Sequence, residues 1–299
     1  MTKRQRFIAW FAWAVLGWNI LVVLWGALVR STGSGAGCGN HWPLCNGQVI
    51  PLSPNTHTLI EFVHRMMTGV SVFAMIALAL IILRGLQKPH PARKAVAMAA
   101  LLLVFEALLG ALLVKLGYVT GNQSVGRVVL LSIHLTNTLV YLAFLTLTAW
   151  LASGNPAPRL KLVQWLALAS TLVVGVSGSL AALGDTLFPA TSLRAAFAQD
   201  MASDSPMLLR LRGVHPLSVA ISTVALLWLV SRARLLPSLR TKTLIAVTLG
   251  LFASQILVGI ADIVLLAPWW MQVLHLLGAD FYWISLLMLA FDSATLEAA

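Results

Sequence analysis

Four histidines of this sequence lie inside long apolar runs, where an ionisable side chain is costly. They are His64, His134, His215 and His275, and the other three histidines lie outside those runs. A membrane interior penalises ionisable groups, so a side chain of this kind found there usually has a functional partner. We therefore take these four histidines as the first candidate site residues.

The four histidines form two pairs, because each half of the chain carries one in its second apolar run and one in its fourth. Imidazole is a common axial ligand of haem iron, and two imidazoles at equal depth on two helices could clamp one iron from both faces. Zinc or copper is a weaker interpretation, because neither half offers a third thiol or carboxylate at ligand spacing. A histidine hydrogen-bonded to a neighbouring helix explains any one of the four, but it explains four at matched positions poorly. The pattern predicts two haem sites.

Basic side chains lie within about seven residues of the candidate ligands. They could pair with the anionic propionates of haem, or they could extend toward lipid headgroups. Both interpretations stay open for each of them: Arg65, Arg127, Arg210 and Arg212.

Glu61 precedes His64 by three positions and therefore shares its helix face. A catalytic carboxylate is one interpretation. The other is a capping box with Thr58 as the N-cap and Glu61 at N3. Arg212 occupies the matching position in the second half, which suggests that the two sites do different work. Glu106 and Asp280 are further acids inside apolar runs, and either a proton relay or a neutral acid bonded to a neighbouring helix would explain them.

The two cysteines, Cys38 and Cys45, lie in the first outer connection. That side of a bacterial membrane is oxidising, so a disulfide is permitted. A disulfide that closes the loop, a redox-active pair and an incomplete metal site that includes His41 are the three alternatives.

Eight apolar runs must position these residues. Of the 299 residues 59% are hydrophobic and 10% charged, whereas a soluble chain has roughly 25% charged residues. About 20 apolar residues span a bilayer as a helix, and lipid tolerates no open strand edge. The sequence therefore predicts an all-α membrane protein whose helices lie near 8–29, 59–83, 94–116, 128–152, 162–183, 207–231, 241–264 and 270–291.

The basic residues gather at the N-terminus and in every second connection, which accounts for the net charge of +11 without nucleic acid as a partner. By the positive-inside rule both termini are cytoplasmic. The first run has no small-residue cleavage site, so we expect a retained helix and not a signal peptide. This topology places each of the four histidines five to nine residues past the outer end of its helix, in about the outer third of the membrane.

The chain divides into two halves that resemble a diverged repeat. The histidines recur at offsets of roughly 150 residues, as do Glu106 with Gly110 and Gln255 with Gly259. Repeats of this kind often place ligand sites inside each bundle. We predict two four-helix halves, residues 1–152 and 159–299, joined by a linker at 153–158.

At this point the sequence resembles the haem A synthase family. The resemblance rests on the segment from Val29 to Gly35, then Cys38 and Cys45, then the run Glu61-Phe62-Val63-His64-Arg65. The three later histidines follow in the order and the helices expected for that family, so the resemblance covers nearly the whole chain.

The resemblance implies an oxidoreductase that converts the C8 methyl group of haem O into the formyl group of haem A, which terminal oxidases require. His64 and His134 would hold the substrate haem, and His215 and His275 would hold a haem b that carries electrons away. Glu61 would assist at the substrate site, and Cys38 and Cys45 would form the outer disulfide. The second outer loop lacks the additional cysteine pair of some members, so no role of that pair can be transferred.

The implied location is the bacterial plasma membrane, with lipid and the haem O synthase that supplies the substrate as partners; a homo-oligomer stays open. The main alternative is an electron-carrying dihaem cytochrome b, which explains the four histidines but leaves the unpaired Glu61 unexplained. A transporter explains the repeat but predicts no haem.

Overall fold

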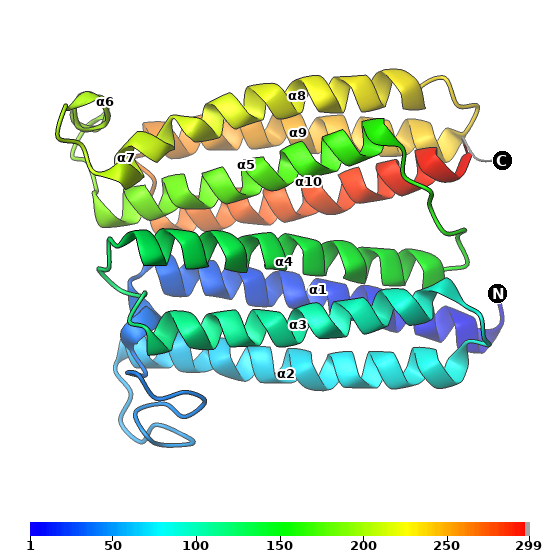
Figure 1. Ribbon diagram of the computed structural model, residues 1–299, viewed down its shortest axis with the longest axis horizontal. Coiled ribbons are helices and arrows are strands. Elements are labelled where there is room, and N and C mark those ends of the chain that lie inside the picture. Colours follow the sequence, from blue (N-terminus) through cyan, green and yellow to red (C-terminus); the bar gives the residue numbers. More distant parts are fainter. Residues whose placement is uncertain (297–299) are drawn as a thin grey trace.

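The computed structural model describes residues 1–296, and all the regular elements within this part of the chain are helices. Eight helical segments within it are long and apolar enough to cross a membrane, which confirms the predicted fold class and number of spans. Figure 1 shows the helices α1 (Lys3–Ser31), α2 (Thr56–Gly85), α3 (Pro91–Lys115), α4 (Val125–Ala152), α5 (Leu162–Leu187), α6 (Leu193–Met201), α7 (Met207–Arg212), α8 (Val214–Ala233), α9 (Leu239–Val264) and α10 (Trp269–Leu296).

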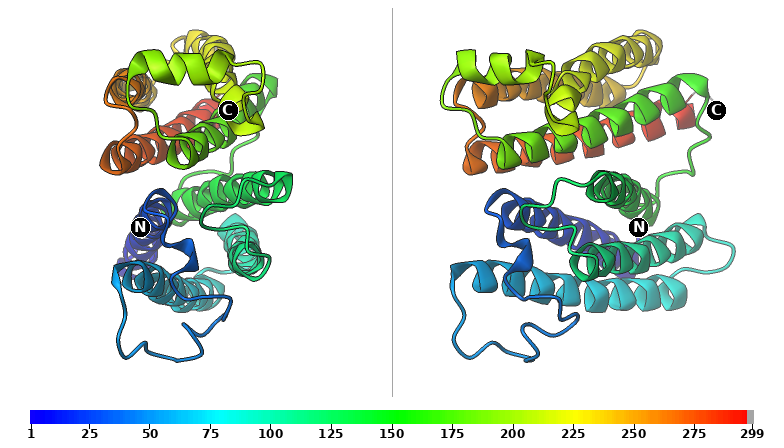
Figure 2. Two further views of the ribbon diagram at one scale, coloured as in Figure 1. Left: turned by 90° about the vertical axis from the view of Figure 1, so that its left-hand side faces the viewer. Right: turned by 60° about the vertical axis from the view of Figure 1, so that its left-hand side comes forward.

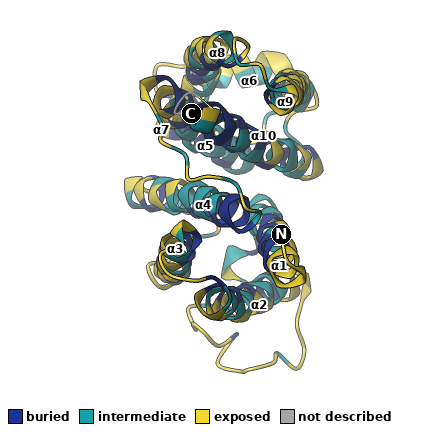
Figure 3. Ribbon diagram, turned by 90° about the vertical axis from the view of Figure 1, so that its right-hand side faces the viewer, coloured by how far each residue is buried: buried dark blue, intermediate teal, exposed yellow. Residues whose placement is uncertain are grey.

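The long helices lie side by side, and the start of α1 and the end of α10 lie at one end of the bundle (Figure 1). We call this the terminal end and the opposite one the loop end. Seen along the helices, α1–α4 gather in a first group and α5, α8, α9 and α10 in a second (Figure 3). Helices α1 and α4 of the first group contact α5 and α10 of the second. One contact near the middle is a hydrogen bond of 2.9 Å from Trp283 Nε1 to the carbonyl of Leu139.

The main apolar core lies toward the terminal end. It includes the first turns of α1 from Ile8 to Leu16 and the last turns of α4 from Tyr141 to Ala152. Trp150, two residues before α4 ends, is among the largest fully buried side chains. A smaller buried cluster lies near the loop end and consists of Val128, Leu180, Leu183 and Leu208. Tight packing of the helices is therefore concentrated away from the histidines.

The first long connection at the loop end is closed by a disulfide. Residues 32–55 project beyond the helices and contain a short 3-10 helix, Ser34–Ala36, and the disulfide between Cys38 and Cys45 (Figure 2). The disulfide confirms the pairing that the resemblance implied.

The second connection at the loop end contains a helix of its own, α6. Helix α5 continues to Leu187, and α6 crosses the loop end of the second group (Figure 2). The signal for α6 is its N-cap, because Ser192 Oγ accepts a hydrogen bond from the backbone amide of Ala195.

Candidate functional site

The four histidines occupy equivalent places in four helices. His64 is eight residues after the first residue of α2, and His134 is nine after that of α4. His215 is eight residues after Met207, where the span formed by α7 and α8 begins, and His275 is six after the start of α10. All four helices begin at the loop end, so the imidazoles lie at similar depth in that half of the bundle.

Within each group the two imidazoles lie close enough to interact electrostatically, His64 with His134 and His215 with His275. The two histidines of each pair lie on different helices. The structure therefore brings together the pairs that the sequence suggested.

A helical glycine faces each of the four imidazoles. A Cβ added to Gly26 would lie 3.1 Å from His64 Cε1, and one added to Gly178 would lie 2.8 Å from His215 Cε1. The corresponding distances are 3.3 Å from Gly259 to His275 Cε1 and 3.9 Å from Gly110 to His134 Cε1. Side chains at the first three positions would crowd the rings, so the absence of a Cβ makes room for the imidazoles beside α1, α5 and α9.

The Nδ1 atoms of the histidines indicate what these sites could hold. Those of His64 and His275 are buried and have no hydrogen-bond partner among the described residues. Nδ1 of His134 makes no hydrogen bond either but lies 3.5 Å from Oε1 of Glu106, and Ser177 Oγ lies 3.3 Å from Nδ1 of His215. Buried polar atoms usually have partners. Paired imidazoles with unpartnered nitrogens, set against glycines in the less tightly packed half of each group, fit an axial pair for a haem.

Glu61 is buried beside the connection 32–55. Its Oε2 accepts a hydrogen bond of 2.8 Å from the backbone amide of Cys38, and its Oε1 lies 2.5 Å from Nη2 of Arg65. The residue is 4% exposed. The carboxylate therefore links the α2 turn that carries His64 to the disulfide-closed loop.

The capping box suggested for Glu61 is wrong. Helix α2 begins at Thr56 and its N-cap is Asn55, whose side chain accepts from the backbone amide of Thr58. Glu61 thus lies beyond the first turn, and its partner is an amide 23 positions earlier in the chain.

The four candidate propionate-binding arginines all have protein partners. Arg65 Nη1 donates 2.6 Å hydrogen bonds to the carbonyls of His41 and Leu44, in addition to its ion pair with Glu61. Arg127 donates to the carbonyl of Asn122, and Arg210 donates to that of Ser203. These contacts join the arginines, which belong to helices, to the connections at the loop end, and propionate binding stays a prediction for each of them.

Arg212, which takes the place of Glu61 in the second half, lies among acids. Its Nε is 2.9 Å from Asp185 and its Nη1 is 3.1 Å from Asp200. The two halves thus hold opposite charges at matched positions, each neutralised by its own partners.

Arg30 was not among the candidates, and it is a polar residue that joins the two groups at the loop end. Its guanidinium donates 3.0 Å to Gln272 Oε1 in α10 and 3.3 Å to Thr186 Oγ1 in α5. Gln272 lies three positions before His275. The sequence does mark Arg30 as unusual, because it is a cation at the end of an apolar run. Its partners could not be predicted, because they are more than 150 residues away in the sequence.

The two intramembrane acids have different surroundings. Glu106 contacts His134, Asn137 and Thr138 of α4. Asp280 is buried in α10, and its Oδ2 has no hydrogen-bond partner among residues 1–296.

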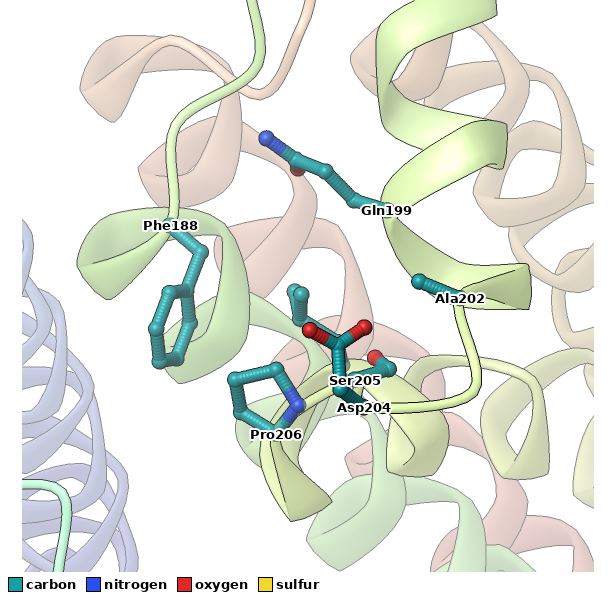
Figure 4. Close-up of a pocket in the computed structure, with 7 residues that line it drawn as sticks. Phe188, Gln199, Ala202, Asp204, Ser205 and Pro206 are labelled. Carbon is teal, nitrogen blue, oxygen red and sulfur yellow. The ribbon is translucent and has the colours of Figure 1, made fainter.

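A hollow of about 280 Å³ opens at the loop end of the second group, between the end of α5 and the connection from α6 to α7 (Figure 4). The carboxylate of Asp204 points into it, with Phe188, Gln199 and Pro206 around it. None of the predicted site residues lines this hollow, so we do not assign it to the histidine sites.

Comparison with known proteins gives a family match and several similar proteins. The COX15-CtaA family, described as cytochrome oxidase assembly protein, matches residues 9–287. A protoheme IX farnesyltransferase of Thermus thermophilus is 45% identical over 292 residues, which is 95% of this chain and 48% of that protein. This chain thus spans about half the length of that relative.

Two proteins named heme A synthase are similar over shorter stretches. The one from Shouchella clausii is 45% identical over 92 residues, 31% of this chain and 31% of that protein. The one from Halalkalibacterium halodurans is 36% identical over 147 residues, 48% of this chain and 47% of that protein.

Proposed function

Because the chain belongs to the COX15-CtaA family of cytochrome oxidase assembly proteins, we propose that it is a haem A synthase that oxidises the C8 methyl group of haem O to the formyl group of haem A. The observation that carries the proposal is the arrangement of four imidazoles in two pairs, each imidazole facing a helical glycine. The names of the shorter relatives support the same activity.

We assign the substrate to the first half, residues 1–152, and a resident haem b to the second half, residues 159–299. His64 and His134 would hold the iron of haem O, and His215 and His275 would hold that of haem b. A bound haem b would supply one-electron transfer away from the substrate. Glu61 supports this division, because a carboxylate lies beside the first pair whereas Arg212 takes the equivalent place in the second half.

Glu61 would stabilise positive charge that develops on the substrate during oxidation. Oxidation of a methyl group removes protons and electrons from its carbon, and a nearby carboxylate stabilises positive charge that develops there. The Cys38 amide and Arg65 both donate to Glu61, which fixes the position of the carboxylate.

The loop end would face outward and the termini the cytoplasm, in a bacterial plasma membrane. The basic residues near the terminal end support this orientation. A haem O synthase would supply the substrate, and the name protoheme IX farnesyltransferase of the Thermus relative supports such a partner.

The direct test is to extract and separate the haems of the purified protein made in cells with and without a haem O source. We expect haem b in both preparations, and haem O together with haem A only where the source is present. A chromatogram with the same two haems in both preparations would show a dihaem electron carrier, and a preparation without haem would remove the assignment altogether.

A further inference from the structure

A carboxylate lies beside the Nδ1 atom of one candidate ligand. Oε1 of Glu106, from α3, is 3.5 Å from Nδ1 of His134 in α4. Among residues 1–296 no other of the four intramembrane histidines has a carboxylate oxygen within 4 Å of a ring nitrogen.

The structure holds this carboxylate in place from two sides. Oε2 accepts a 2.6 Å hydrogen bond from Nδ2 of Asn137, and Oε1 accepts from the hydroxyl of Thr138. Asn137 Nδ2 also donates to the carbonyl of Leu102 on α3. Both donors come from the turn that follows His134, so the carboxylate is held next to the imidazole.

The second half has neutral groups at the matching positions. Gln255 takes the place of Glu106, four residues before the glycine that faces the imidazole in each half, and Gly278 and Ala279 take those of Asn137 and Thr138. The Gln255 amide lies against Gly278, where a Cβ would be 2.0 Å from Nε2, and its Oε1 has no hydrogen-bond partner among residues 1–296. The carboxylate and its two donors are therefore a feature of the first half.

We propose that Glu106 is a positioning residue that orients His134 and lowers the reduction potential of the iron that His64 and His134 hold; the inference rests on the proposed function. A carboxylate next to the free nitrogen of a ligating imidazole fixes the ring and raises its basicity as a ligand. Negative charge near an iron stabilises its oxidised state, and the groups around an axial ligand are one of the ways in which a protein tunes a haem.

The difference between the halves gives electron transfer a direction. A carboxylate beside the first iron and an amide near the second make the first site the more reducing of the two. Electrons taken from the substrate in the first half would then pass to the haem of the second half with a favourable free-energy change.

The test is a redox titration, followed by absorbance, of the intact purified protein with its bound haems. Glu106→Gln keeps the size of the side chain and removes its charge, so the potential of the haem held by His64 and His134 should rise while that of the other haem stays constant. Gln255→Glu is the reciprocal variant and should lower the potential of the haem in the second half. Asp204→Asn, an exposed outer acid, is the control and should shift neither potential.

Glu106→Asp keeps the charge and decides the matter if Glu106→Gln does not fold; its first haem should stay close to the wild-type potential. Unchanged potentials in a folded Glu106→Gln variant that retains both haems would overturn this inference alone, as would a second haem that does not shift in a folded Gln255→Glu variant. A wild-type protein that is made with a haem O source and still has no haem in the first half would overturn the proposed function as well, so the two failures can be told apart.

Discussion

The backbone amide of Cys38 donates a hydrogen bond to the carboxylate of Glu61, with 2.8 Å between nitrogen and Oε2. Cys38 belongs to the disulfide that closes the outer loop, and Glu61 lies one helical turn before His64. The loop therefore sets the position of the acid that we assign to substrate oxidation.

Replacing Glu61 by Gln should abolish most haem A formation and leave folding and haem b content near normal. The amide can still accept from the Cys38 amide, but the charge that would stabilise the substrate carbon is lost. The haem composition of the variant checks this. Asp204→Asn is the matched control and should leave the product unchanged, whereas normal haem A output from Glu61→Gln would reduce Glu61 to an anchor for the loop.

The four histidines should fall into two classes when each is changed to Ala. Loss of His215 or His275 should remove the low-spin haem b and stop turnover. Loss of His64 or His134 should spare that haem and prevent conversion of haem O. Absorption spectra and extracted haems from all four variants make the comparison, and equal haem content in all of them would contradict the ligand assignment.

The facing glycines offer a test of geometry without removal of a ligand. In Gly178→Ala the new Cβ would lie 2.8 Å from His215 Cε1, so the imidazole must move and haem b occupancy should fall. In Gly110→Ala the Cβ would lie 3.9 Å from His134 Cε1, an ordinary contact, and occupancy should be retained. Haem per protein is the measurement. Equal occupancy in the two variants would show that the glycines do not limit the ring positions.

Replacing Cys38 and Cys45 by Ser should lower stability and leave partial turnover in the folded fraction. A disulfide across a short loop contributes on the order of 2–3 kcal/mol. Because Cys38 also carries the donor to Glu61, turnover per folded molecule should fall below the wild-type value without vanishing. Thermal unfolding and turnover measured on the same sample separate the two effects, and complete loss of turnover in a well-folded variant would favour a redox role for the cysteines.

The membrane orientation predicts which connections a reagent can reach. A cysteine introduced at Gln87, which is exposed at the terminal end between α2 and α3, should resist an impermeant thiol reagent applied to intact cells. One introduced at Thr191, exposed in the second outer connection, should react. The reverse pattern of labelling would show that the protein has the opposite orientation in the membrane.

The lengths of the apolar runs were enough to predict the eight spans. The positions of the histidines within those runs were enough to predict that they lie at similar depth, because each position depends on residues within one helix. The partners of Glu61 and Arg30 were not predictable, since the Cys38 amide and Gln272 belong to segments that only the folded chain brings near. The capping box failed for a related reason. Asn55 and Thr58 are both good N-caps, and the local pattern does not decide between them.

Arg30 of α1 is hydrogen-bonded to Thr186 of α5 and Gln272 of α10, and this has a consequence for the gene. A coding sequence cut between residues 153 and 158 would give two fragments that each lack the hydrogen-bond partners supplied by the other. Trp283 of the second fragment would likewise lose the carbonyl of Leu139 in the first. Function from such a split should require that one cell makes both fragments, so that genetic complementation, rather than either fragment alone, restores the protein.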